Sequence, residues 1–173
     1  MILGTTPLTF FHVVISLAGI VTGLVVMFGM LTRKPLDGWV AVFLATTVAT
    51  SVTGFLFPFV KFLPSHGFGI VSLLILPVAI VGRYFFHLRG AWSWLYTVSS
   101  VTALYLNMFV LIVQLFLKVP PLRALAPTQT EPAFAIAQGL NLVLFVWLGV
   151  VVTLRARRAP ANVPAGAHYH VSS

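Results

Sequence analysis

Five continuous apolar stretches of 21 to 24 residues divide this 173-residue chain. Because an α-helix rises about 1.5 Å per residue, each stretch can cross a hydrocarbon core of about 30 Å. The stretches are apolar throughout rather than alternating, which favours helices over the strands of a membrane barrel. The predicted spans are residues 8–31, 39–60, 68–88, 94–117 and 134–154. The sequence therefore predicts an all-α membrane protein, a bundle of five transmembrane helices joined by short loops.

The composition supports a location in lipid and excludes several classes of function. Hydrophobic residues make up 60% of the chain and charged residues 7%, whereas a soluble domain carries about 25% charged residues. The net charge of +8 does not indicate nucleic-acid binding, because the basic residues lie at span ends and form no basic, aromatic stripe in a soluble segment. The absence of cysteine excludes disulfides, thiolate metal sites and thiol catalysis. The bilayer is therefore the expected partner.

The basic residues are divided unevenly between the two predicted ends of the bundle. One end receives Arg33, Lys34, Arg83, Arg89, Arg155, Arg157 and Arg158, and the other receives Lys61, Lys118 and Arg123. The positive-inside rule assigns the first end to the cytoplasm. We therefore expect the N-terminus outside, the C-terminus in the cytoplasm, a bundle over residues 1–158 and a disordered cytoplasmic tail over residues 159–173.

Polar side chains gather in the outer half of three predicted spans. His12, Gln114 and Gln138 lie about 9 to 13 Å from the middle of their spans, on the same side. Polar groups at such depths are costly to bury without partners, so they predict a pocket for a small hydrophobic ligand: a quinone, a lipid or haem. The complete predicted pocket comprises His12, Thr53, His66, Asn107, Gln114, Glu131, Gln138 and Asn141. The alternative is that each of these residues locks two helices together with a private partner.

Two histidines form the candidate metal site. His12 and His66 are both expected on the outer side, where two imidazoles could bind one haem iron. His87 is near the opposite face and cannot join them. The possible cofactors are therefore haem b or a quinone, and the competing interpretation has His66 in water and His12 bonded to a neighbouring helix.

Two further features have mainly structural interpretations. At the cytoplasmic end, Arg83 and His87 are four residues apart on one predicted helix face, Arg83 could pair with Asp37, and Arg89 could bind lipid headgroups. The pair Gly19-x-x-x-Gly23 is typical of close helix packing. That face could serve within the bundle, or it could contact a second copy or a larger membrane complex.

The chain lacks the motifs that would indicate an enzyme. It has no nucleotide-binding loop, no zinc-protease motif and no nucleophile elbow. No Asp or Glu lies inside a predicted span, which argues against a proton relay built on carboxylates. The sequence favours a non-enzymatic ligand-binding protein, with a small transporter or channel subunit and an accessory subunit of a larger complex as alternatives.

Three stretches resemble a known group of proteins. Residues 43–58 (FLATTVATSVTGFLFP), 104–114 (LYLNMFVLIVQ) and 125–132 (LAPTQTEP) are similar to those of small bacterial inner-membrane proteins to which no activity is assigned. The resemblance covers roughly residues 6–154 and implies a bacterial inner membrane. The layout is also loosely similar to small haem-binding membrane cytochromes, but this chain lacks their paired histidines at one depth in facing spans.

Overall fold

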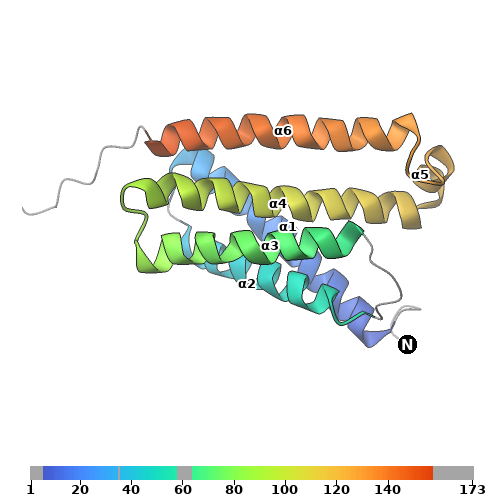
Figure 1. Ribbon diagram of the computed structural model, residues 1–173, viewed down its shortest axis with the longest axis horizontal. Coiled ribbons are helices and arrows are strands. Elements are labelled where there is room, and N and C mark those ends of the chain that lie inside the picture. The colour runs from blue at the N-terminus through green and yellow to red at the C-terminus, as the bar shows by residue number, and fades with distance from the viewer. Residues whose placement is uncertain (1–5, 35, 58–63, 158–173) are drawn as a thin grey trace, which may run out of the picture.

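The computed structural model describes residues 6–34, 36–57 and 64–157 (Figure 1), and every regular element within these ranges is helical. The helices are α1 (Pro7–Thr32), α2 (Asp37–Gly54), α3 (Pro64–Ile80), the π-helix η1 (Val81–Phe85), α4 (Ala91–Lys118), α5 (Pro120–Leu125) and α6 (Pro132–Arg157). Four segments are long and apolar enough to cross a membrane: α1, Gly67–Phe85, α4 and α6. The predicted all-α class is confirmed for these ranges, and the four segments indicate a membrane protein.

Helix α2 is shorter than the predicted span 39–60. It has 18 residues and is not among the four segments that meet the criteria for a membrane span. The chain turns after Gly54, where the amide of Phe55 donates to the carbonyl of Val52 at 3.1 Å. Pro58 follows closely, and a proline disfavours helical geometry in the residue before it. The remainder of the predicted span, residues 58–60, lies outside the described residues.

The third predicted span also differs from the structure at both ends. Helix α3 begins at Pro64, where a turn is predicted, because proline fits the first position of a helix, whose N–H would have no partner. Helix α3 continues directly into the π-helix η1, where the amide of Phe86 donates to the carbonyl of Val81 at 3.1 Å. It ends before the predicted Leu88, since His87 and Leu88 take positive φ values of 50° and 58°.

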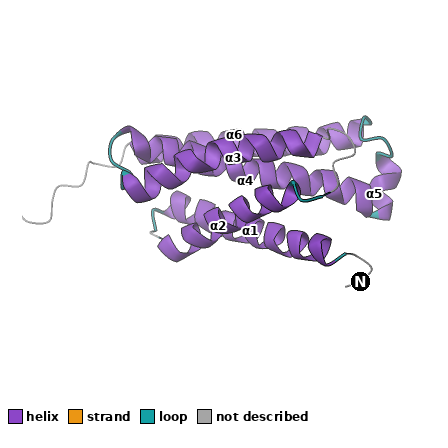
Figure 2. Ribbon diagram, turned by 60° about the horizontal axis from the view of Figure 1, so that its bottom comes forward, coloured by secondary structure: helices purple, strands orange, loops and turns teal. Residues whose placement is uncertain are grey.

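The long helices run antiparallel to their neighbours in sequence, with α4 at the centre of the bundle (Figure 1). Helix α4 contacts α1, α3 and α6, whereas α1 packs mainly on α2 and crosses the others obliquely. Figure 2 shows α1 and α2 as one pair, with α3, α4 and α6 on the other side of the bundle. The buried core includes Val26, Phe43, Tyr96, Leu104 and Phe145.

The glycine pair of α1 is used inside the bundle. A Cβ at Gly23 would lie 2.6 Å from Leu104 Cδ1 and 2.8 Å from Phe43 Cε2, and one at Gly19 would lie 3.2 Å from Thr46 Oγ1. Both glycines are buried and allow α1 to approach α2 and α4 closely. The chain's own helices cover this face within the described structure, and a contact of it with a second copy or a larger complex stays a prediction.

The described basic residues follow the predicted division between the two ends. Six lie at the end where α1, η1 and α6 finish and α4 begins: Arg33, Lys34, Arg83, Arg89, Arg155 and Arg157. We call this the basic end. Lys118 and Arg123 lie at the opposite end, beside α5, which we call the α5 end. Lys61, Arg158 and the tail 159–173 are outside the described residues.

Candidate functional site

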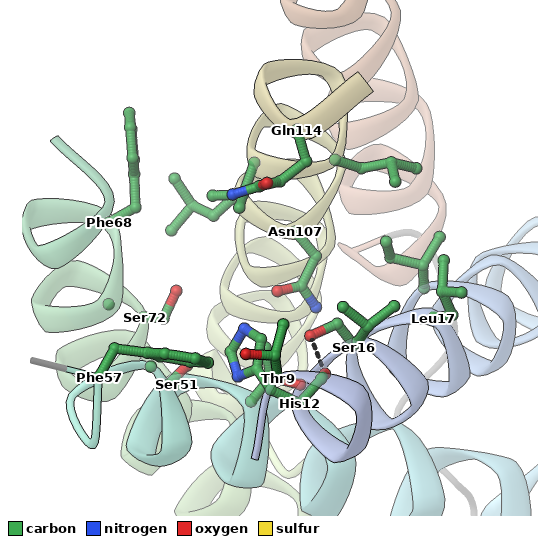
Figure 3. A pocket seen from close by; sticks show the side chains of 18 of the residues that line it. Thr9, His12, Ser16, Leu17, Ser51, Phe57, Phe68, Ser72, Asn107 and Gln114 are labelled. Carbon is green, nitrogen blue, oxygen red and sulfur yellow. Dashed lines mark hydrogen bonds between the residues drawn. The ribbon is translucent and has the colours of Figure 1, made fainter. Parts of the chain in front are cut away.

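A cavity of about 440 Å³ opens among α1, α2, α3 and α4 (Figure 3). It extends from Ile20 and Leu106, near the middle of their helices, to Thr9 and Lys118 at the α5 end. Apolar side chains form most of its wall, including Val13, Leu17, Phe55, Phe57, Phe68, Val110, Leu111 and Leu115. The polar lining side chains are Thr9, His12, Ser16, Thr50, Ser51, Ser72, Asn107, Gln114 and Lys118. We call this space the α5-end cavity.

His12 is fixed in this cavity by a bond to the next helix. Its Nδ1 atom lies 2.8 Å from Thr53 Oγ1, and Thr53 Oγ1 lies 2.7 Å from the carbonyl oxygen of Ala49. A hydroxyl has one proton, and the Thr53 proton is used on Ala49, so the Thr53 oxygen accepts and His12 Nδ1–H donates. The His12 lone pair is then on Nε2. The ring also packs edge-on against Phe57, with 5.2 Å between centroids.

Helix α4 supplies two amides to the same space. Asn107 Nδ2 donates to Thr47 Oγ1 of α2 at 3.3 Å, which is the kind of bond between helices that the alternative interpretation expects. Gln114 makes no hydrogen bond within the described part of the chain, and Figure 3 shows its amide directed into the space between α3 and α1. Seven residues separate the two amides, so they lie about 10 Å apart along the helix.

Gln138 and Asn141 do not line the cavity, which corrects the predicted pocket. Gln138 Nε2 donates to the carbonyl of Phe109 at 3.1 Å, across the contact between α4 and α6. Asn141 is buried, as predicted, but its Nδ2 has no partner in the described structure, and neither has Gln138 Oε1. Helix α6 packs on α4 and contacts α2 and α3 little or not at all. The side chain of Gln138 therefore lies at the contact of α4 with α6 and not in the cavity.

Glu131 closes the turn before α6 and does not reach the cavity. Its carboxylate accepts from the amides of Thr128 and Thr130 at 3.1 and 3.0 Å, and from Thr128 Oγ1 at 2.9 Å. Desolvation raises the pKa of Glu131, but the hydrogen bonds from Thr128 and Thr130 together outweigh it and leave the pKa below its ordinary value. Gln129 Nε2 donates to the carbonyl of Val113 at 3.0 Å, which ties this turn to α4.

Of the two histidines predicted to bind haem, the structure describes the side chain of His12. His12 lines the cavity, whereas His66 lies in the first turn of α3 and its side chain is outside the described residues. Among the described residues no group of three His, Cys, Asp or Glu side chains could hold a metal ion. What the structure supports is one imidazole in an apolar cavity.

Sequence reasoning missed several polar lining groups. Ser51 and Ser72 are small and do not stand out in an apolar span. Thr50 also lines the cavity, and its Oγ1 is buried without a partner in the described structure. Lys118 was predicted only as an orienting charge, yet it lies at the mouth of the cavity.

At the basic end the predicted ion pair is confirmed. Arg83 Nη2 contacts Asp37 Oδ1. The predicted common face of Arg83 and His87 is wrong, because η1 ends at Phe85 and His87 has left-handed backbone angles. His87 is exposed, and its Nδ1 lies 3.0 Å from the carbonyl oxygen of Phe85, to which it donates. Arg89 is exposed.

Comparison with protein-family models, curated proteins and solved structures finds no match to this chain. A function therefore has to be argued from the sites themselves, since an all-helical bundle by itself indicates none.

Proposed function

We propose that this chain is a non-enzymatic membrane protein that binds a small apolar molecule with a carbonyl or hydroxyl group in the α5-end cavity. The quinone class fits best in its reduced, quinol form, whose hydroxyl can donate to Nε2 of His12. The observation that carries the proposal is His12, which is held by Thr53 and presents Nε2 within a mostly apolar wall. Ligand pockets commonly have volumes of about 300 to 1,000 Å³ and combine apolar walls with a few polar groups.

The polar groups of the cavity match this chemistry. An amide N–H of Gln114 can donate to a ligand carbonyl, and Nε2 of His12 can accept from a ligand hydroxyl. Neither group carries a fixed charge, so binding a neutral ligand leaves no unpaired ion. The apolar side chains between Ile20 and Lys118 would surround the ring and the beginning of a hydrophobic tail.

Five spans in a bacterial inner membrane, with a cytoplasmic basic end, complete the proposal. Helix α2 would be the fifth span, since 18 residues cover about 27 Å. The six basic residues at one end and two at the other support the orientation. A reporter fused after Arg158 should be active in the cytoplasm, and one inserted between Lys118 and Pro132 should be active outside. Cytoplasmic activity of the second fusion would overturn the orientation.

The binding experiment uses the full chain in mild detergent, under reducing conditions, and a ubiquinol with a short isoprenoid tail, whose hydroxyl can donate to His12 Nε2. His12→Ala should weaken binding at least tenfold, which corresponds to one charge-neutral hydrogen bond and some packing, about 1.4 kcal/mol. His87→Ala is the matched control, because it removes an exposed imidazole from the other end and should leave binding unchanged. Thr53→Val keeps the imidazole but removes the acceptor that orients it, and should give an intermediate loss.

Two results would contradict this function. Equal affinities for His12→Ala and the parent chain would remove His12 from the site. A co-purified haem with a visible absorption band that survives His12→Ala would place a different cofactor elsewhere. Transport is the weaker alternative for the described part of the chain, because buried Phe43 and Leu104 pack against Gly23, three residues beyond the cavity-lining Ile20.

A further inference from the structure

A second cavity, of about 340 Å³, lies at the basic end. Cationic side chains from three elements line it: Arg33 and Lys34 where α1 ends, Arg83 in η1, and Arg155 in α6. Its remaining wall includes the apolar side chains Val26, Met30, Val40, Leu88 and Val152, and the polar side chains Ser93, Tyr96 and Thr97. We call this space the basic cavity. It shares no lining residue with the α5-end cavity.

The charges around this cavity are not balanced. The whole chain has two acidic residues, and of these Glu131 lies at the other end. Asp37 is therefore the one carboxylate near the four cations, and its partner is Arg83. Arg33, Lys34 and Arg155 form no ion pair within the described part of the chain. Three cations beside one cavity repel one another unless an anion lies among them.

Two of the guanidinium groups are positioned by the fold. Arg83 Nη2 contacts Asp37, and its guanidinium lies 5.7 Å from the centre of the Tyr96 ring. Arg155 Nη1 donates to the carbonyl of Leu31, in the last turn of α1. The side chain of Arg83 is 19% exposed, whereas that of Asp37 is 75% exposed. Arg83 is therefore held mainly inside the protein, beside the cavity, rather than extended into water.

A simpler explanation is that these residues only cap helix ends and orient the chain. Cations are favourable at helix C-termini and at the cytoplasmic membrane surface. That explanation accounts for Arg89 and Arg157, which lie at the same end and do not line the cavity. It does not explain why four cations from three separate elements line one cavity whose other lining residues include several apolar side chains.

We infer that the basic cavity binds a phosphate group. Guanidinium groups match the oxygens of phosphate through paired N–H donors, and lysine adds a point charge. The group could belong to an anionic phospholipid such as phosphatidylglycerol or to a soluble phosphate ester. The apolar lining residues favour the lipid, because its glycerol and first acyl carbons would contact Met30 and Val152. This inference does not depend on the function proposed for the α5-end cavity.

The test measures the thermal stability of the full chain with each phosphate source. Nanodiscs of phosphatidylcholine, with and without phosphatidylglycerol, supply the lipid, and glycerol 1-phosphate added to the detergent-purified chain supplies the soluble ester. The double variant Arg33→Gln/Lys34→Gln removes two cations without touching the Asp37–Arg83 pair or the bond from Arg155 to Leu31. Arg89→Gln/Arg157→Gln is the matched control, because it removes the same charge from the same end outside the cavity.

The apparent affinity for phosphatidylglycerol is taken from the rise in thermal stability. If this affinity falls at least tenfold in the cavity variant and stays near the parent value in the control, the result supports the lipid. The same pattern with glycerol 1-phosphate supports a soluble ester. Equal losses in both double variants would mean attraction by net charge alone and would overturn the inference. No stabilisation of the parent chain by either anion would overturn it as well.

Discussion

The two cavities of this bundle differ in the kind of polar group that each contains. The α5-end cavity has one imidazole and two amides in an apolar wall, with Lys118 at its mouth. The basic cavity has four cations, with a single carboxylate nearby. Neutral groups can select a ligand by hydrogen bonds deep within a bilayer. Fixed charges are costly there and are tolerated where water or headgroups are close. The same bundle therefore offers two chemically distinct sites at its two ends.

The largest effect is expected where α1 packs on α2 and α4 at Gly23, next to Phe43 and Leu104. Gly23→Ala should lower the free energy of unfolding by about 1 to 3 kcal/mol, because the new Cβ would lie 2.6 Å from Leu104 and 2.8 Å from Phe43. Gly139→Ala is the control, since a Cβ there meets nothing within 4 Å, and it should be neutral or slightly stabilising. Chemical or thermal unfolding in one detergent compares the two. Equal effects would mean that this contact is not tightly packed.

A smaller effect is expected from the carboxylate at the basic end. Asp37→Asn should cost less than about 1 kcal/mol of stability, because exposed ion pairs contribute little and Asp37 is 75% exposed. It should also strengthen anion binding in the basic cavity, since Arg83 would lose its competing partner. Quinol binding at the α5 end should not change. A loss of anion binding would instead mean that Asp37 is needed to position Arg83.

The smallest effect concerns pH at the α5 end. Because hydrogen bonds from Thr128 and Thr130 lower the pKa of Glu131, its ionised form stabilises the fold above its unfolded pKa. This contribution is lost as the pH falls through the folded pKa. The parent chain should therefore melt at a slightly higher temperature than Glu131→Gln at pH 7, and this difference should shrink as the pH falls below 4.5 and through the lower folded pKa. A difference that grows on acidification would contradict this sign.

The ends of a helix could be predicted from the sequence where an apolar stretch of membrane length is bounded by polar or charged residues. Helix α1 begins at Pro7 and ends before Arg33, close to the predicted span, because apolar length and flanking polar residues fix both ends. Pro64 was less informative, since proline suits a turn and a first helical position equally. The end of α3 in a π-helix and in left-handed residues depends on how the chain must turn toward α4, which no local pattern encodes.

The candidate site shows the same limit at the level of side chains. Residue counting along a helix gives depth, and depth correctly brought His12 and Gln114 together in one cavity. It could not show that Gln138 lies on the other side of α4, because the direction of a side chain around the bundle depends on which helices are neighbours. Only the packing of α6 on α4 determines that.

The bond between His12 and Thr53 has a consequence for the direction in which protons can move. The chain of hydrogen bonds runs from His12 through the Thr53 hydroxyl to the carbonyl of Ala49, and a backbone carbonyl can accept a hydrogen bond but does not take up a proton at ordinary pH. The chain is therefore a dead end for proton conduction on the protein side. A quinol whose hydroxyl donates to Nε2 would be held in place without a path to exchange protons through α2. Such a site is suited to retaining a molecule in its existing redox state rather than to converting it.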